Sequence, residues 1–197
     1  MTQTRSGCLK PLLGLLGLGL LLGVVRYYGG AWLDRYQRPW AFSTTEPRLV
    51  GSWTGNFTDP DGIRKTLTLR IDSPLDESSR WSKAFRRPRR HSRTNNRAFD
   101  GAATVVSRRG TEQYEAWGAI SRDDDHGFSL NTRVVDEKTQ LLPNFALGTV
   151  RKAQWQGDKI TFTLGFNYRR ADGSSHWDSA DPRFSRLVPV TLTRQPD

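Results

Sequence analysis

The sequence contains few of the residues that build disulfide, metal or cofactor sites. It has a single cysteine, Cys8, among 197 residues and therefore no internal disulfide. Its three histidines stand far apart, and no C-x-x-C or H-x-x-x-H spacing of a metal site occurs. Phosphate-binding glycine loops, dinucleotide fingerprints and nucleophile elbows are also missing. We therefore expect no metal, no cofactor and no catalytic residue, and an enzyme ranks behind a binding module and a structural protein.

Acidic residues are missing from the most basic parts of the chain. The formal net charge is +10 at pH 7. Residues 1–30 and 80–97 contain basic residues and no acid, whereas the rest of the chain is close to neutral. The basicity therefore belongs to these segments and not to the folded body. In the second segment the basic residues are Arg80, Lys83, Arg86, Arg87, Arg89, Arg90, Arg93 and Arg97.

This basic segment lies in a long insertion at 72–97, between two expected strands. Loops of this length are usually functional or disordered. Arginine binds phosphate and carboxylate groups with two hydrogen bonds, and Trp81 and Phe85 stand among the charges. Three interpretations stay open: a solvated insertion, contact with a membrane surface or another anionic polymer, and binding of nucleic acid. The export-like N-terminus and the neutral remainder of the chain disfavour nucleic acid as a partner.

Residues 1–31 are expected to form a hydrophobic helix that acts as a signal-anchor. Pro11–Val25 is a run of 15 uncharged residues, a length between a signal-peptide core and a membrane span. Tyr27, Tyr28 and Trp32 are typical of a membrane interface, which favours one uncleaved span over a cleaved signal peptide or a buried helix. A short basic stretch before an apolar run is typical of an export signal. We therefore expect the C-terminal domain outside the cytoplasm, either tethered or secreted after cleavage.

After a linker at 32–47, residues 48–197 show short alternating runs separated by turn residues, with no helical period. Hydrophobic residues make up 36% of the chain, which is enough for a core. Most connections are short, so consecutive strands should pair antiparallel. Eight strands favour a closed up-and-down barrel over a two-sheet sandwich, which the same alternation also fits. The expected strands are Leu49–Thr58, Ile63–Ile71, Ala98–Ser107, Thr111–Ser121, Phe128–Val135, Ala146–Trp155, Lys159–Tyr168 and Leu187–Arg194.

The inside of an eight-stranded barrel is either filled by side chains or holds one small ligand. The apolar faces of the expected strands supply the candidates for its lining: Leu67, Leu69, Leu130, Phe162, Leu164 and Phe166. Two turn clusters, at 123–126 and 176–181, combine acids with a histidine. We interpret both clusters as solvated surface loops.

Gly51-Ser52-Trp53 stands on the first expected strand, and Arg194 ends the last one. This arrangement resembles the calycins, a group that includes lipocalins, fatty-acid-binding proteins and avidins. The resemblance implies that Gly51, Trp53 and Arg194 close one end of the barrel, with the guanidinium stacked on the indole by cation–π attraction. The chain departs from secreted lipocalins because it lacks their disulfides and their long N-terminal coil.

These features predict a membrane-tethered, extracytoplasmic and non-catalytic binding module. It would hold a small apolar or amphiphilic ligand, contact an anionic surface through the segment 80–97, or do both. The alternative is a structural or interaction protein whose barrel core is packed and which acts as a scaffold for a partner protein.

Overall fold

The computed structural model describes residues 17–18, 36, 38–43, 48–74, 96–124, 126–136, 140–176 and 181–196. Most of the expected N-terminal helix and most of the basic segment lie outside the described residues. Within the described ranges, no helix is long and apolar enough to cross a membrane. The ranges from 48 onward carry the eight expected strands.

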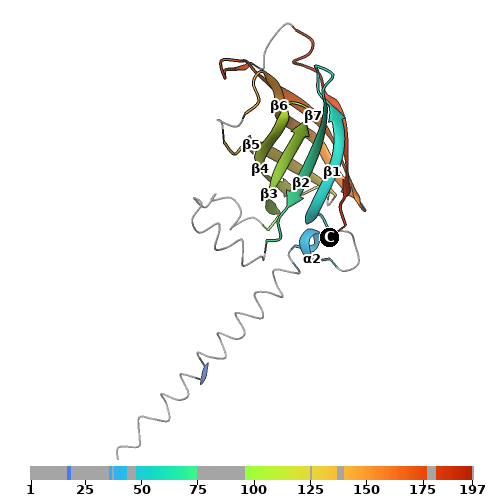
Figure 1. The fold of residues 1–197 in the computed structure, drawn as a ribbon. Helices are drawn as coiled ribbons and strands as arrows, with labels where there is room; N and C mark the ends of the chain where they lie inside the picture. Colours follow the sequence, from blue (N-terminus) through green and yellow to red (C-terminus); the bar gives the residue numbers. More distant parts are fainter. Residues whose placement is uncertain are drawn as a thin grey trace, which may run out of the picture.

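The described strands form one antiparallel sheet that closes on itself (Figure 1). Each strand from β1 to β7 pairs with the next, and β9 pairs with both β7 and β1, so that eight strands close the barrel. The two-residue strand β8 pairs only with the end of β7. This topology confirms the predicted up-and-down barrel and excludes the sandwich. The strands are β1 Gly51–Thr58, β2 Arg64–Ile71, β3 Ala98–Ser107, β4 Gly110–Ile120, β5 Gly127–Val134, β6 Asn144–Gln156, β7 Lys159–Arg169, β8 Ser175–His176 and β9 Val188–Arg194.

The alternation in the sequence decides which side chains face inward. On β2 the buried residues are Lys65, Leu67, Leu69 and Ile71, and the residues between them are partly or fully exposed. The turn before β2 is fixed by Asp59, whose Oδ1 accepts the backbone N–H groups of residues 61 and 63 at 3.0 and 2.8 Å. The observed strands begin and end within a few residues of the expected ones. Only β8 was not expected, because it lies within a loop of polar residues.

The barrel has two chemically different ends. At the first, named here the Trp53 end, β1 begins, β2 ends and β9 finishes. A short helix, α2 (Pro39–Phe42), lies against this end with Trp40 and Ala41 buried (Figure 1). Part of the expected linker at 32–47 therefore packs on the barrel. At the opposite end, named the Lys65 end, β1 finishes and β2 begins.

Strands β1 and β9 approach each other closely at Gly55. A Cβ atom at this position would collide with the carbonyl oxygen of Thr191 on β9. Gly55→Ala should therefore lower the free energy of unfolding by about 2 kcal/mol or more, because the closing strands must separate. Gly165→Ala on β7 is the matched control, since its Cβ would meet its nearest neighbour at an ordinary 3.4 Å. Urea unfolding of both variants measures the difference, and equal stabilities would contradict the tight closure.

Candidate functional site

Trp53 and Arg194 meet at the seam between the first and last strands. Trp53 is fully buried, and it pairs with Arg194 in the β1–β9 register. The guanidinium carbon lies 4.2 Å from the centre of the indole ring, a contact worth about 0.5–2 kcal/mol. Gly51 leaves space for this side chain, because a Cβ there would lie 2.7 Å from Arg194 Nη1. The structure thus brings Gly51, Trp53 and Arg194 together at one end of the barrel.

Arg194 also holds the chain that precedes β1. Its Nη1 donates a hydrogen bond to the carbonyl oxygen of Val50 at 2.9 Å, and its Nη2 donates to that of Arg48. Its Nε pairs with the Asp158 carboxylate at 3.0 Å. Because the donors of a guanidinium lie in one plane, Arg194 stacks on Trp53 and binds three oxygens at the same time. The chain between α2 and β1 is thereby fixed at the Trp53 end.

The basic segment leaves the barrel at this same end, because it joins the end of β2 to the start of β3. Trp40 of α2 donates its indole N–H to the carbonyl oxygen of Asn96 at 3.2 Å. Arg97, the last of the eight basic residues, donates to the carbonyl oxygen of Ser121 on the barrel. The other seven lie outside the described residues. Both segments singled out in the sequence therefore join the barrel at its Trp53 end.

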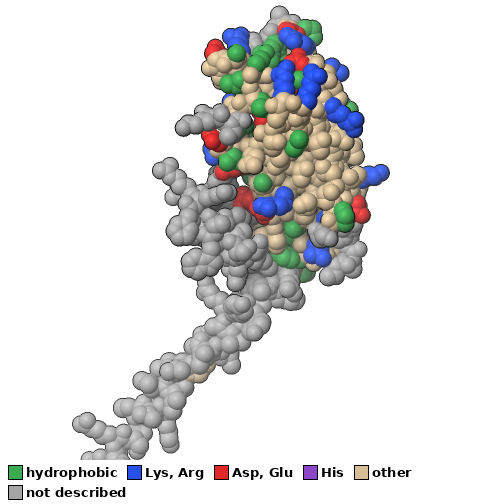
Figure 2. All heavy atoms as spheres, in the orientation of Figure 1, with side chains coloured by type: hydrophobic (Ala, Val, Ile, Leu, Met, Phe, Trp, Pro, Cys, Tyr) green, Lys and Arg blue, Asp and Glu red, His purple; other side chains and the backbone are tan. Residues whose placement is uncertain are grey.

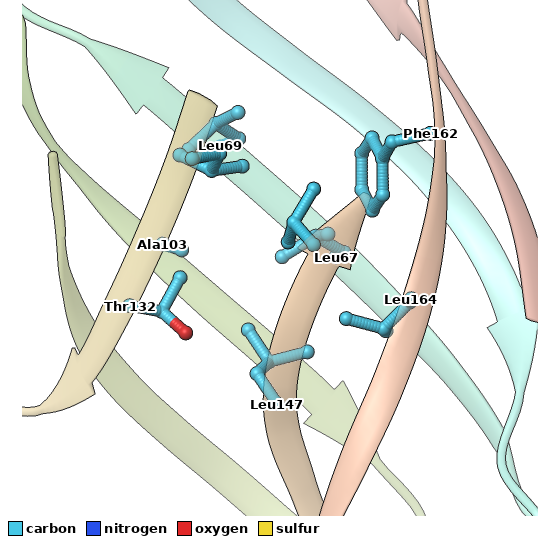
Figure 3. A pocket seen from close by; sticks show the side chains of 9 residues that line it. Leu67, Leu69, Ala103, Thr132, Leu147, Phe162 and Leu164 are labelled. Atoms are coloured by element: carbon cyan, nitrogen blue, oxygen red, sulfur yellow. The ribbon is translucent and has the colours of Figure 1, made fainter. Parts of the chain in front are cut away.

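A small apolar void lies inside the barrel (Figure 3). Its volume is about 10 Å³. Of the six residues expected to line the barrel, all except Phe166 border this void. Phe166 is buried nearer the Lys65 end, where it packs against Phe57 and Phe145. The lining residues are Leu67, Leu69, Ala103, Leu130, Thr132, Leu147, Val150, Phe162 and Leu164.

This void is far smaller than a pocket for an organic ligand. A single water needs about 10–15 Å³, whereas ligand pockets occupy about 300–1,000 Å³. Side chains also close both ends of the barrel. Trp40 packs on Phe99 at the Trp53 end, and Phe184 packs on Phe145 and Tyr168 at the other. In the described conformation the barrel is filled by its own side chains.

A network of buried polar side chains occupies the Lys65 end. Lys65 and Asp59 are 2% and 1% exposed, and their charged groups lie 3.3 Å apart. Lys65 Nζ also donates to Asn144 Oδ1 at 2.8 Å and to the carbonyl oxygen of Phe145 at 2.6 Å. The ammonium therefore donates two hydrogen bonds and is paired by charge with the Asp59 carboxylate. Desolvation lowers the pKa of Lys65, and the Asp59 carboxylate opposes that shift.

Glu112 extends this network across the barrel. Its Oε2 accepts hydrogen bonds from Asn144 Nδ2 at 2.9 Å and from the Tyr114 hydroxyl at 3.0 Å. Its Oε1 has no hydrogen-bond partner among the described residues. Burial, together with the Glu112 carboxylate, raises the pKa of Tyr114, so the phenol of the folded protein remains a hydrogen-bond donor even above pH 10. The network links the β1–β2 turn to β2, β4 and β6.

Sequence reasoning missed these residues, although a signal for two of them was present. Lys65 stands two residues before Leu67, and Glu112 stands two residues before Tyr114. Strict alternation therefore turns both charged side chains inward. Asn144 carried no such signal, because it belonged to a loop in the expected strand pattern.

Of the two acid–histidine turns, the structure describes the first almost completely. Asp124 Oδ1 accepts the backbone N–H of His126 at 3.0 Å, and its Oδ2 accepts Gln154 Nε2 at 3.1 Å. The His126 bond is the main cause that lowers the pKa of Asp124. Within the described ranges, no three His, Cys, Asp or Glu side chains gather as metal ligands. In the second turn, residues 177–180 lie outside the described ranges.

Comparison with solved structures finds designed β-barrels that resemble this fold. A de novo designed fluorescence-activating β-barrel is 13% identical, with 75% of this chain and 94% of that chain covered and a TM-score of 0.37. EF1p2_mFAP2b bound to DFHBI is 15% identical with the same coverages and a TM-score of 0.43. The redesigned barrel mFAP0 bound to DFHBI is 15% identical, with 74% of this chain and 98% of that chain covered and a TM-score of 0.38. No family model and no curated protein matches the chain. At these identities and scores, the likeness says nothing about what this chain binds.

The contacts of Arg194 predict that lysine cannot replace it. Arg194→Lys keeps the charge beside Asp158 but loses the flat stacking on Trp53 and the paired donors, so the free energy of unfolding should fall by about 1–3 kcal/mol. Arg133→Lys is the control, because Arg133 is 68% exposed and its pair with Glu115 is worth less than about 1 kcal/mol. Chemical denaturation compares the two variants. Equal losses of stability in the two variants would show that Arg194 does not hold the barrel closed.

The buried ion pair predicts that the cost of replacing one partner depends strongly on whether the other is still present. Lys65→Met leaves the Asp59 carboxylate buried without an opposite charge, which costs about 3–5 kcal/mol. Adding Asp59→Asn should restore a large part of this loss, because the amide oxygen still accepts the two turn N–H groups. A double-mutant cycle in urea measures the coupling. Additive effects of the two changes would show that the pair does not interact as described.

The raised pKa of Tyr114 predicts a loss of stability in alkali. The folded state keeps the phenol proton above pH 10, whereas the unfolded chain releases it, so the stabilisation is complete below pH 10 and falls as the pH rises further. Tyr114→Phe cannot ionise, so the stability difference between the parent protein and this variant should shrink above pH 10. Unfolding curves between pH 8 and pH 11 check this. A difference independent of pH would contradict it.

Proposed function

We propose that this chain is a non-catalytic, membrane-tethered binding module that stands outside the cytoplasm and contacts an anionic surface through the basic segment at 80–97. In this proposal the N-terminal segment is an uncleaved anchor, and the barrel is the rigid body that carries the basic segment. The observation that carries the proposal is that the described residues next to the two segments meet at the Trp53 end, where the Trp40 indole N–H is bonded to the carbonyl oxygen of Asn96.

This shared end supports membrane contact on geometric grounds. An anchor that leads into α2 brings the Trp53 end toward the bilayer, and the basic segment leaves the barrel beside it. Each arginine or lysine near an anionic bilayer surface contributes about 1 kcal/mol. Arg97 is held at the barrel wall by its bond to Ser121, so the proposed contact with lipid rests on the other seven basic residues of the segment.

The filled interior favours a second candidate, an interaction protein with a packed core. A barrel of calycin type, as the Trp53–Arg194 contact suggests, would then serve as a scaffold for a partner protein. A carrier of a small apolar or amphiphilic ligand, the other role expected from the sequence, would require the barrel to open, because the described void of about 10 Å³ is roughly thirtyfold smaller than the smallest ligand pockets, at about 300 Å³. Native mass spectrometry of the gently purified full chain separates these roles. A defined extra mass that leaves on activation would favour the carrier, and a clean apo mass would favour the packed scaffold.

The proposed surface contact predicts a salt-sensitive approach of the barrel to anionic lipid. Full-length protein in nanodiscs of phosphatidylcholine, with or without phosphatidylglycerol, should show energy transfer from its tryptophans to dansyl-labelled lipid. We expect stronger transfer in the anionic discs and a fall with added salt. Deletion of residues 82–95 should remove the difference between the two lipids.

A variant at the opposite end controls for net charge. Arginine and lysine side chains also gather around the Lys65 end (Figure 2), where Arg64 and Arg108 are exposed. Arg64→Gln with Arg108→Gln removes two charges there and should leave the transfer unchanged. Arg89→Gln with Arg90→Gln removes the same amount of charge from the basic segment and should weaken the energy transfer. Equal behaviour of the two variants, or transfer insensitive to salt, would overturn the proposed contact.

A further inference from the structure

The void inside the barrel is lined by residues of five strands, β2, β3, β5, β6 and β7. Leu130 and Thr132 of β5 and Leu147 and Val150 of β6 border it, and no lining residue belongs to β1 or β9. Figure 3 shows Thr132 and Leu147 reaching into the same space from two different strands. The void therefore borders the junction of β5 with β6.

At this junction the backbone ladder is short. Among the described residues, only Gly127 and Phe128 of β5 are in register with β6, opposite Gln154 and Ala153. By contrast, seven pairs join β4 to β5. Further toward the Lys65 end, no register pair joins the two strands within the described residues. We call this stretch, between 129–134 of β5 and 144–152 of β6, the β5–β6 seam.

The irregular path of β6 explains the short ladder. Its pairing with β7 shifts register twice, between Leu147 and Val150 and between Arg151 and Gln154. Lys152 lies at the second shift with a φ of 54°, a backbone conformation that is uncommon for a residue with a Cβ. Such bulges bend a strand away from its partner. The part of β6 between Asn144 and Lys152 therefore pairs with β7 and not with β5.

Among the eight strands of the barrel wall, the β1–β9 junction has an equally short ladder, but other contacts hold it closed. Strands β1 and β9 share two register pairs, and there Gly55 packs against the backbone of Thr191. Arg194 adds its hydrogen bonds at the same junction. At the β5–β6 seam, the wall residues border the void of about 10 Å³ instead. Opening the wall at the seam therefore breaks fewer backbone hydrogen bonds than opening it between β4 and β5, and it leaves the contacts of Gly55 and Arg194 between β1 and β9 intact.

The lining also contains one polar group that is suited to a ligand. The Thr132 hydroxyl oxygen is buried and has no hydrogen-bond partner among the described residues. The other lining side chains are aliphatic or aromatic. A small apolar molecule with one hydrogen-bonding group matches this surface, since its apolar part meets the leucines and its polar group satisfies Thr132.

We propose that the void is a binding site for a small, largely apolar molecule that carries one hydroxyl or similar group, and that this molecule enters through the β5–β6 seam and pairs with Thr132. Leu147 and Val150 move outward with β6 as the site enlarges. This site is independent of the surface contact made by the basic segment, so either can fail without the other.

Phenol and benzene are a matched pair of probes for this site. The full-length protein in nanodiscs is labelled on Leu and Val methyl groups and titrated with each probe by NMR. We expect saturable shifts at Leu130, Leu147 and Val150 with phenol. Thr132→Val preserves the shape of the side chain but removes its hydroxyl group. It should lower the affinity for phenol about two- to tenfold, which corresponds to one hydrogen bond, and leave the affinity for benzene unchanged. Amides of residues 129–134 should exchange with solvent more slowly when phenol is bound.

A variant that fills the void tests the location. Ala103→Leu places a larger side chain in it and should abolish the shifts with both probes. If that variant does not fold, Val150→Phe fills the space from β6. Three outcomes overturn the proposal: no saturable shift with either probe, shifts that persist in a folded variant with a filled void, or an equal loss of phenol and benzene binding in Thr132→Val.

Discussion

Arg194 stacks on Trp53 where the first and last strands of the barrel meet, and this contact determines much of what surrounds it. The barrel can close only if β9 returns beside β1, and the guanidinium joins them from the last residue of β9. The same side chain binds the carbonyl oxygens before β1, so the closure of the sheet also fixes the chain that leads to α2. One arginine thus links the fold of the barrel to the point where the N-terminal segment joins it.

The two ends of the barrel are stabilised by different kinds of interaction. At the Trp53 end, aromatic side chains and a partly buried arginine close the sheet. At the Lys65 end, a buried ammonium and two carboxylates are joined through Asn144, and removing one partner would leave a charge without compensation. Such a network favours one arrangement of the turns it connects. The Lys65 end is therefore held by specific hydrogen bonds, and the interior between the ends is held by close packing.

Alternation in the sequence was enough to predict the strands, because apolar residues recur at every second position along most of β2 and β7. Their closure into a barrel was predicted from the short connections between eight strands, since alternation alone also fits a sandwich. Alternation also turned Lys65 and Glu112 inward, although their partner Asn144 could not be recognised. Whether the barrel is filled depends on how side chains from all eight strands combine in space, which no single strand reveals. The β5–β6 seam also has no clear sequence signal, since Lys152 takes a positive φ without being a glycine. Phe166 alternates with the lining residues, yet it joins the aromatic cluster at the Lys65 end because the strands are tilted and staggered.

The central claim is that the barrel stands on an anionic membrane with its Trp53 end toward the lipid. Paramagnetic relaxation measures this orientation most directly, with full-length protein in anionic nanodiscs that contain spin-labelled headgroups. We expect broadening of the Trp40 indole signal and of backbone amides near Gly51 and Ser121, and sharp signals at Gly110 and Asn144. Broadening at Gly110 and Asn144 with a sharp Trp40 signal would contradict the account, because the Lys65 end would then face the membrane.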